Sequence, residues 1–193
     1  RFGWRFASLR SVKKTTRYAE SHSGSRMRYL RTLREWIQKH GSQNVVYMDE
    51  SGFEAQCYRT HGWARRGTKV HGKIAGNHKK GRINLIMAQR GKEWLAPLTF
   101  TGSCHHDFVT GWFEQCLIPE LKPNSLVIID NAPFHNKADI KAALEKHGHT
   151  LLPLPTYSPD FNPIEQTFAI LKRRRQATGT AINQLLMGNN YVD

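Results

Sequence analysis

The sequence predicts an α/β fold in which a mixed β-sheet is flanked by helices. Short runs that are apolar throughout favour parallel strands covered on both sides, and stretches with helical periodicity alternate with them in the second half of the chain. The chain has 193 residues, of which 39% are hydrophobic, enough for one domain with a core. We divide it into a basic linker with a leading helix (residues 1–40) and a main domain (residues 41–193).

The first elements are a linker, a helix and a strand. Residues 1–23 are polar and basic with little periodicity, which indicates a linker. Apolar residues recur at helical spacing from residue 25 to residue 40, and Gly41 supplies a stop. These apolar residues are Met27, Leu30, Leu33, Trp36 and Ile37. A strand is predicted over residues 44–49.

The middle of the chain predicts more strands and a second helix. Residues 55–82 are rich in Gly, Lys and Arg and are typical of a strand pair with a long basic loop. Residues 82–88 and 94–100 predict two strands, and the polar residues 89–92 between them favour a hairpin. A helix follows over about residues 105–118.

The second half alternates strands and helices. We predict a strand at 126–130, a helix at 137–147, a strand at 149–154, and a helix that begins at Asn162 and continues past Leu171. The full order therefore has three strands with hairpin-like connections, a helix, and then strand, helix, strand, helix. This order fits a ribonuclease H-like arrangement, in which three antiparallel strands are followed by two parallel ones.

Three acidic residues lie where local signals specify the backbone. Asp49 and Asp130 each close an apolar run, and Glu165 lies in the first turn of the helix that Asn162-Pro163 opens. A carboxylate at the end of a buried strand is costly unless something compensates it. In the predicted fold the first and fourth strands are neighbours, so Asp49 and Asp130 meet there and the last helix adds Glu165. A divalent cation such as Mg²⁺, which prefers oxygen ligands, is the natural compensator.

The net charge of +14 is concentrated in two segments. Residues 1–40 hold eleven Lys and Arg against two acids, and residues 55–82 hold eight basic residues and no acid. Such segments indicate polyanion binding, although a generally basic soluble surface is the alternative. The candidate nucleic-acid contacts are Arg65, Arg66, Lys69, Lys79, Lys80, Arg82, Lys172, Arg173 and Arg174. For the run at 172–175 a solvated helix face is the competing interpretation.

Other features argue against several classes of protein. The three Cys residues are widely spaced and form no C-x-x-C pair, which argues against a structural zinc site or a disulfide framework. No apolar run approaches the roughly 18 residues needed to span a bilayer. We therefore expect no membrane partner and a location in the cytoplasm.

Three sequence blocks carry a family resemblance. They are YMDESGF at 47–53, IDNAPFH at 129–135 and YSPDFNPIE at 157–165. With these blocks in this order, the chain resembles transposases of the mariner superfamily, and in particular the bacterial insertion sequence 630 family. Members of that superfamily carry an Asp, Asp, Glu triad with about 34 residues between the last two acids. Here 34 residues separate Asp130 from Glu165.

The resemblance implies a ribonuclease H-like catalytic domain that cleaves transposon ends and joins them to target DNA. Its cofactor would be two Mg²⁺ ions, for which Mn²⁺ is expected to substitute. Asp49 would bridge the two ions, with Asp130 on one and Glu165 on the other. The partner would be double-stranded DNA, both transposon ends and target, bound by a homodimer at the nucleoid. The alternatives are a nuclease that cuts without joining, and an inactive remnant that only binds DNA.

One departure from the family concerns the N-terminus. Relatives carry N-terminal helix-turn-helix modules, and nothing in residues 1–193 resembles them. The chain also begins at Arg1, so we expect it to be a fragment of a longer protein. Without those modules it is expected to bind DNA mainly through phosphate charge, with little sequence preference.

Each candidate residue also has a structural interpretation. Asp49 and Asp130 could form turns after their strands, and Glu165 could complete a capping box with Asn162. The rival metal ligands are Glu50, Asp107 and Asp160, of which Asp160 favours a turn or cap role. The auxiliary candidates are Asn131 and His135. They could orient a phosphate or water, and His135 could assist proton transfer or have a surface or capping role.

Overall fold

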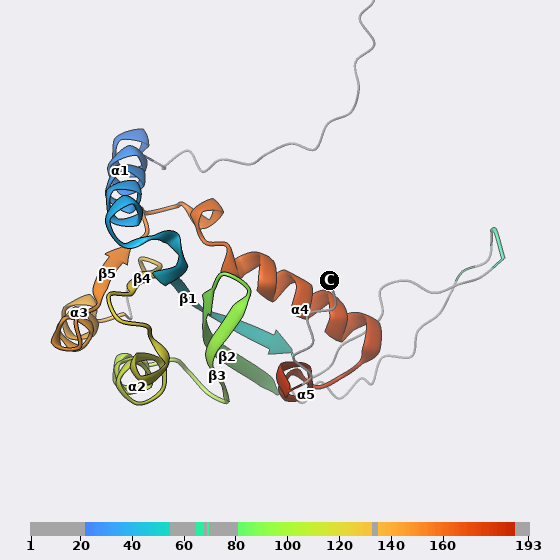
Figure 1. Cartoon of the computed structure of the whole chain (residues 1–193). Coiled ribbons are helices and arrows are strands. Elements are labelled where there is room, and N and C mark those ends of the chain that lie inside the picture. The colour runs from blue at the N-terminus through green and yellow to red at the C-terminus, as the bar shows by residue number, and fades with distance from the viewer. Residues whose placement is uncertain (1–21, 55–64, 68, 70–80, 133–134, 188–193) are drawn as a thin grey trace, which may run out of the picture.

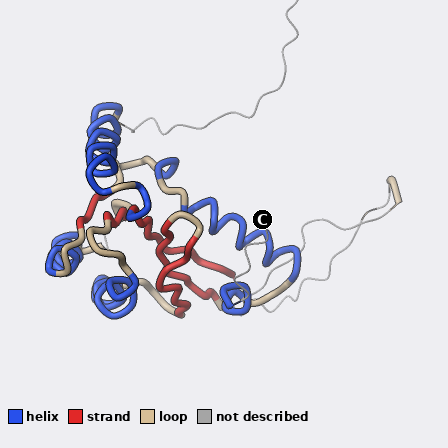
Figure 2. The backbone as a smooth tube through the Cα atoms, viewed as in Figure 1, coloured by secondary structure: helices blue, strands red, loops and turns tan. Residues whose placement is uncertain are grey.

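A five-stranded sheet with the strand order β3-β2-β1-β4-β5 organises the chain (Figures 1 and 2). The structure is a computed structural model, and it describes residues 22–54, 65–67, 69, 81–132 and 135–187. The strands are β1 (Val45–Glu54), β2 (Arg82–Arg90), β3 (Glu93–Phe100), β4 (Leu126–Ile129) and β5 (Thr150–Pro153). Pairs β1/β2 and β2/β3 are antiparallel, whereas β1/β4 and β4/β5 are parallel. The predicted mixed sheet of three antiparallel strands followed by two parallel strands is confirmed.

Helices lie on both faces of this sheet. They are α1 (Ser23–His40), α2 (His106–Trp112), α3 (Lys137–Lys146), α4 (Ile164–Thr178) and α5 (Ile182–Met187). The helix predicted over 105–118 changes type along its length, because α2 continues through a π-helical turn, Phe113–Leu117, and a 3-10 turn, Ile118–Glu120. None of the helices in the described ranges has the length and apolar character needed to cross a bilayer.

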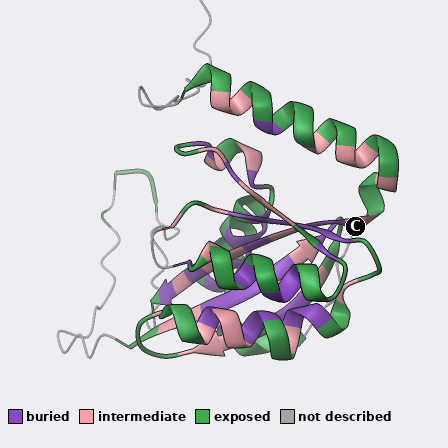
Figure 3. Cartoon of the chain, turned by 90° about the vertical axis from the view of Figure 1, so that its left-hand side faces the viewer, coloured by how far each residue is buried: buried purple, intermediate pink, exposed green. Residues whose placement is uncertain are grey.

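Alternation along the strands sends apolar side chains to both faces, so the sheet is buried between two helical layers (Figure 3). On one face Val46, Met48, Val127 and Ile129 pack with residues of α2 and α3, including Trp112 and Leu144. On the other face Phe53, Leu85 and Met87 pack against Ile164, Phe168 and Leu171 of α4, and Ile182 of α5. On this second face, the first turn of α4 lies beside the middle of β1.

Helix α1 belongs to the same layer as α4. Its residues Leu33, Trp36 and Ile37 pack against a cluster that includes Val45 of β1 and Leu126 of β4. The prediction of a helix from residue 25 to residue 40 is therefore confirmed, with a start two residues earlier. The boundary drawn at residue 40 stays a prediction.

Strand β1 is longer than predicted. The expected strand ended at Asp49, but β1 continues to Glu54 because β2 pairs with it antiparallel from Tyr47 to Glu54. Parallel pairing with β4, in contrast, is recorded only from Val45 to Tyr47. Asp49 therefore lies in mid-strand, just beyond the point where the parallel partner ends.

Other element boundaries also differ from the prediction. The last predicted helix begins at Ile164 instead of Asn162, and α5 was not predicted. The strand pair predicted over 55–82 falls largely outside the described residues, as does most of the linker at 1–23.

Candidate active site

Asp49 and Asp130 are neighbours because of the register between β1 and β4. The last recorded pair of these parallel strands is Tyr47 with Ile128. Asp49 lies two residues further along β1, and Asp130 lies two residues after Ile128, just past the end of β4. Side chains two residues apart point to the same face of a sheet. Tyr47 and Ile128 both pack in the layer that contains α1. Asp49 is therefore directed to the face covered by α1 and α4, and Asp130 lies near it at the end of β4.

Glu165 approaches the pair from the first turn of α4. Its neighbour Ile164 is fully buried against the sheet, whereas Glu165 is exposed on the adjacent side of the helix. Burial raises the pKa of the Glu165 carboxyl, and the negative charges of Asp130 and Asp160 act in the same direction. The structure thus brings the three predicted acids to one region from three separate elements.

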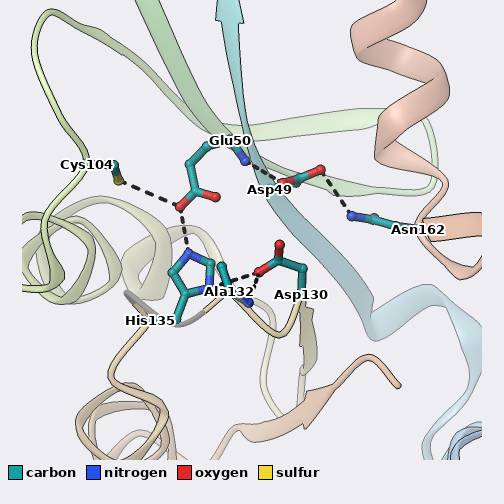
Figure 4. Close-up of polar contacts among 7 residues, drawn as sticks. All are labelled: Asp49, Glu50, Cys104, Asp130, Ala132, His135 and Asn162. Carbon is teal, nitrogen blue, oxygen red and sulfur yellow. Dashed lines mark hydrogen bonds and ion pairs between the residues drawn. The ribbon is translucent and has the colours of Figure 1, made fainter. Parts of the chain in front are cut away.

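Asp49 occupies the most crowded position of the three. Its Oδ1 accepts a hydrogen bond from the backbone N–H of Glu50 at 2.8 Å, and its Oδ2 accepts one from Asn162 Nδ2 at 3.3 Å (Figure 4). Burial raises the pKa of Asp49 to about 7, and the charges of Glu50, Asp130 and Glu165 add to this effect. Asn162 is 4% exposed, and its Oδ1 is buried without a hydrogen-bond partner in the described part of the chain.

Asp130 is held by a buried histidine. His135 Nδ1 lies 3.2 Å from Asp130 Oδ1, and His135 Nε2 lies 3.0 Å from Glu50 Oε1 (Figure 4). Burial opposes a charge on this ring, yet the contacts with Asp130 and Glu50 prevail and raise the pKa of His135 to about 9. Burial alone would raise the pKa of Asp130. The contact with His135 and the hydrogen bond from the Ala132 N–H outweigh burial and lower this pKa. The result is a bridge from Glu50 through an imidazolium to Asp130.

A groove of about 510 Å³ opens beside the acids. Asp49, Glu50 and Asp130 line it together with Arg82 and Asn84. Asn84 Oδ1 accepts a hydrogen bond from Arg82 Nε at 2.9 Å. The described lining thus combines three carboxylates with an exposed guanidinium.

The competing interpretations have mixed outcomes. Asp130 does form an Asx-turn, since its Oδ1 accepts the N–H of Ala132 at 2.9 Å. The capping box is wrong, because no side chain caps α4 and the Asn162 amide is directed to Asp49 instead. Asp107 is exposed on α2, and Asp160 pairs with Arg26.

Of the two auxiliary candidates, His135 is buried and Asn131 is exposed. The His135 side chain is fully buried, so its observed contacts are with Glu50 and Asp130. Asn131 is exposed, and its Nδ2 donates to Thr156 Oγ1 at 3.4 Å. The role of each in a reaction stays a prediction.

Sequence reasoning missed two partners of the acids. Asn162 was assigned as a helix cap, and Glu50 was considered only as a rival ligand. The signal for Glu50 was strand alternation, which sends it to the face opposite Asp49. The pairing of Asn162 with Asp49 spans 113 residues, and no local pattern indicates it.

The basic candidates are placed unevenly. Arg65, Arg66 and Lys69 are exposed, as are Arg82 and the three α4 residues Lys172, Arg173 and Arg174. Lys79 and Lys80 lie outside the described residues. Arg175 is 5% exposed and donates to the carbonyl of Glu54, so the basic run at 172–175 is not one solvated face.

A divalent cation such as Mg²⁺ requires a set of oxygen ligands. As placed in the described ranges, no three His, Cys, Asp or Glu side chains form a group that could hold an ion. The chemistry of the donors nevertheless fits, because all three are carboxylates and the charges of Asp130 and Glu165 contribute to the raised pKa of Asp49. A cation bound by these carboxylates would offset their mutual repulsion.

The histidine bridge leads to a stability prediction. We expect His135→Leu to destabilise the fold by on the order of 2 kcal/mol near pH 6, because Glu50, only 13% exposed, would lose its partner. The folded-state pKa of about 9 lies above the ordinary 6.5. The contribution is therefore complete below pH 6.5 and is lost as the pH rises through 9. Denaturant unfolding at pH 6 and pH 9.5 measures it.

The matched control is His149→Leu. His149 is also buried, but burial lowers its pKa, so its contribution changes with pH in the opposite direction. As the pH rises from 6.5 to 9, the control variant should lose stability just as the wild type does. A destabilisation by His135→Leu that is equal at both pH values would contradict the bridge.

A known protein family matches most of the chain. The sequence profile of the DDE superfamily endonuclease family matches residues 44–185, which contain all three acids. The comparison with curated protein sequences finds no match.

Several solved structures share the fold. A Mos1 transposase paired-end complex with left transposon end is 15% identical, with a TM-score of 0.64, and the match covers 86% of this chain and 53% of that one. The Mos1 mariner paired-end complex with Mn is 17% identical, with a TM-score of 0.64 and coverage of 84% and 53%. The catalytic domain of Mos1 mariner transposase is 13% identical, with a TM-score of 0.55 and coverage of 85% and 76%.

These matches confirm the predicted ribonuclease H-like fold. The chain spans about half the length of the first two of these structures. At such low identity the likeness concerns the fold.

Proposed function

We propose that this chain, which belongs to the DDE superfamily endonuclease family, is the catalytic part of a DNA transposase that cleaves transposon ends and joins them to target DNA. The observation that carries the proposal is the approach of Asp49, Asp130 and Glu165 from β1, β4 and α4. A structural neighbour supports it, since that structure is a Mos1 transposase in a paired-end complex with left transposon end. The three sequence blocks support the narrower assignment to the bacterial insertion sequence 630 family.

Asp49, Asp130 and Glu165 would hold two Mg²⁺ ions, and Mn²⁺ would substitute. Structures of the Mos1 transposase with Mg and with Mn support this choice. Bound divalent ions supply Lewis acidity and a nucleophilic oxygen at neutral pH. The protein itself supplies orientation. Asn162 fixes one oxygen of Asp49, and His135 with the Ala132 amide fixes Oδ1 of Asp130.

Lys172 and Arg173 would bind the DNA backbone next to the acids. Positions 165, 169, 172 and 173 follow one another on a single face of α4, and all four residues are exposed. Residues seven positions apart on a helix are separated by about 10 Å along its axis. Lys172 also lies over the Phe53 ring, 5.6 Å from its centre, which keeps it close to β1. These two cations can therefore contact phosphates of a strand whose scissile bond is at Glu165.

This placement predicts a change in salt dependence. The double variant Lys172→Ala/Arg173→Ala should bind duplex DNA more weakly, and its log–log salt slope should be smaller by about 2, because each lost phosphate contact accounts for about 0.9. Fluorescence anisotropy with a labelled duplex at several salt concentrations measures the slope.

The matched control is Lys141→Ala/Lys146→Ala. These lysines are also exposed, but they lie on α3, on the opposite face of the sheet. Their removal should change the slope by much less. Equal slopes for the two double variants would show that α4 has no special part in DNA binding.

Products of the reaction test the proposed function directly. Incubation of the chain with Mg²⁺, a supercoiled plasmid and a labelled duplex with a free 3′-hydroxyl should yield nicked plasmid and plasmid joined to the label. Nicking without joined label would identify a nuclease. Binding without either product would identify a DNA-binding remnant.

A further inference from the structure

Arg26, in the first turn of α1, binds the turn that precedes α4. Arg26 Nη1 donates to Ser158 Oγ and to Asp160 Oδ1, both at 2.9 Å, and Arg26 Nη2 lies 2.6 Å from Asp160 Oδ2. The guanidinium also lies over the ring of Phe161, 4.0 Å from its centre. Such a two-pronged pair with a stacked ring fixes the orientation of both partners. We name residues 158–162 the pre-helix turn.

An aromatic contact also joins α1 to this turn. Tyr29, one turn after Arg26, stacks on Phe161 with ring centres 5.4 Å apart and an interplanar angle of 14°. Tyr29 is 5% exposed and belongs to the cluster that fastens α1 to the sheet. The pre-helix turn is thus fastened to a helix that is itself anchored on β1 and β4.

Backbone hydrogen bonds tie the residues of the pre-helix turn together. The N–H of Phe161 donates to the carbonyl of Ser158 at 3.1 Å, and the N–H of Asn162 donates to that of Pro159 at 2.9 Å. A shift of Phe161 would therefore carry Asn162 with it. Asn162 contacts Asp49, and Glu165 follows three residues later with its N–H donating to the Asn162 carbonyl at 3.3 Å. The position of the turn consequently sets the positions of two groups of the candidate active site.

The contact between Arg26 and Asp160 should matter less for folding stability than for the geometry of the candidate active site. The side chains of Arg26 and Asp160 are 25% and 59% exposed, and ion pairs this exposed contribute little to folding stability. Catalysis is far more sensitive to position, because a misplacement of about 1 Å can reduce a rate by roughly 10²-fold. Loss of Arg26 should therefore leave the fold intact and still disturb the site.

We propose that Arg26 is a positioning residue, which holds the pre-helix turn so that Asn162 and Glu165 lie correctly beside Asp49. It thereby couples α1, which follows the basic N-terminal segment, to the candidate active site. The part of this inference that concerns reaction rate rests on the proposed function. The part that concerns the turn does not.

Hydrogen–deuterium exchange tests the turn without any assay of activity. In Arg26→Ala, amides of residues 158–166 should exchange several-fold faster than in the wild type, while peptides of β1 and β2 stay unchanged. The control is Arg34→Ala, an exposed arginine about two turns further along α1, which should leave the exchange of 158–166 unchanged. Unchanged exchange in Arg26→Ala would overturn the inference.

Kinetics then test the consequence for the site. In Mn²⁺-dependent nicking, Arg26→Ala should lower the rate at saturating DNA about tenfold with an unchanged Kd for DNA, and Arg26→Lys should rescue it only in part, because Lys lacks the two-pronged geometry. Asp160→Ala should lower the rate by the same factor or less, because Arg26 keeps its contacts with Ser158 and Phe161, and the double variant should be no worse than Arg26→Ala. Additive losses, or a loss confined to DNA affinity, would overturn the positioning role. If the wild type does not nick DNA, the proposed function fails and the exchange experiment still decides whether Arg26 holds the turn.

Discussion

Asp130→Asn is expected to reduce Mg²⁺-dependent nicking of plasmid DNA by at least about 10³-fold, which corresponds to roughly 4 kcal/mol of lost transition-state stabilisation. The substitution replaces a charged ligand by a neutral one of the same shape. The Asn side-chain oxygen can still accept from the Ala132 amide, so the Asx-turn is retained. DNA affinity should therefore stay within about twofold, because it depends on phosphate contacts elsewhere. Gel analysis of nicked plasmid, with anisotropy for binding, measures both quantities.

Asp107→Asn serves as the matched control for this experiment. Asp107 was a rival ligand in the sequence, but its side chain is 88% exposed on α2. This variant should nick at the wild-type rate. If Asp130→Asn also nicks at the wild-type rate, the assignment of Asp130 to the reaction is wrong.

Asp49→Asn should abolish nicking and at the same time stabilise the metal-free protein. The pKa of Asp49 in the fold is about 7, above the ordinary 3.8, because burial and the neighbouring carboxylates disfavour its charge. The folded state therefore binds more protons than the unfolded state between these two values, and stability falls as the pH rises from 3.8 to 7. Above pH 7 the full penalty remains, on the order of 4 kcal/mol before structural relaxation.

The stability of this variant is measured by thermal unfolding in EDTA. At pH 8 the Tm of Asp49→Asn should exceed that of the wild type by at least about 3 °C, since 1 kcal/mol shifts the Tm of a chain of this size by about 2–4 °C. At pH 5 the difference should shrink, because the wild-type carboxyl is then protonated. The control Asp139→Asn, an exposed acid on α3, should show no such gain. A lower Tm for Asp49→Asn at pH 8 would mean that Asp49 stabilises the fold and is not strained by its neighbours.

Much of the site could be predicted from the sequence because its acids follow strong local signals. The apolar runs before Asp49 and Asp130 indicate buried strands, and neighbouring parallel strands bring their ends together. Asn162-Pro163 and the apolar residues after it located a helix near Glu165, although the capping role of Asn162 was wrong. Strand and helix periodicity thus carried most of the fold.

The remaining features depend on contacts between distant segments. Strand β1 runs past Asp49 because β2 pairs with it, and no pattern within β1 indicates where that pairing ends. Arg26 and Asp160 are 134 residues apart, and in sequence the first is one of many basic residues while the second resembles a turn residue. The burial of Arg175 likewise follows from its contact with Glu54, which the basic run around it conceals.

A titration with Mn²⁺ tests most directly whether the three acids act as one centre. Electron paramagnetic resonance of free Mn²⁺ gives the affinity of the wild type and of Asp49→Asn, Asp130→Asn and Glu165→Gln, each in the presence of the same duplex DNA. If the acids share bound ions, every single substitution should weaken binding at least about tenfold, and Asp107→Asn should leave it unchanged. Wild-type affinity in any one of the three variants would remove that acid from the centre and contradict the account.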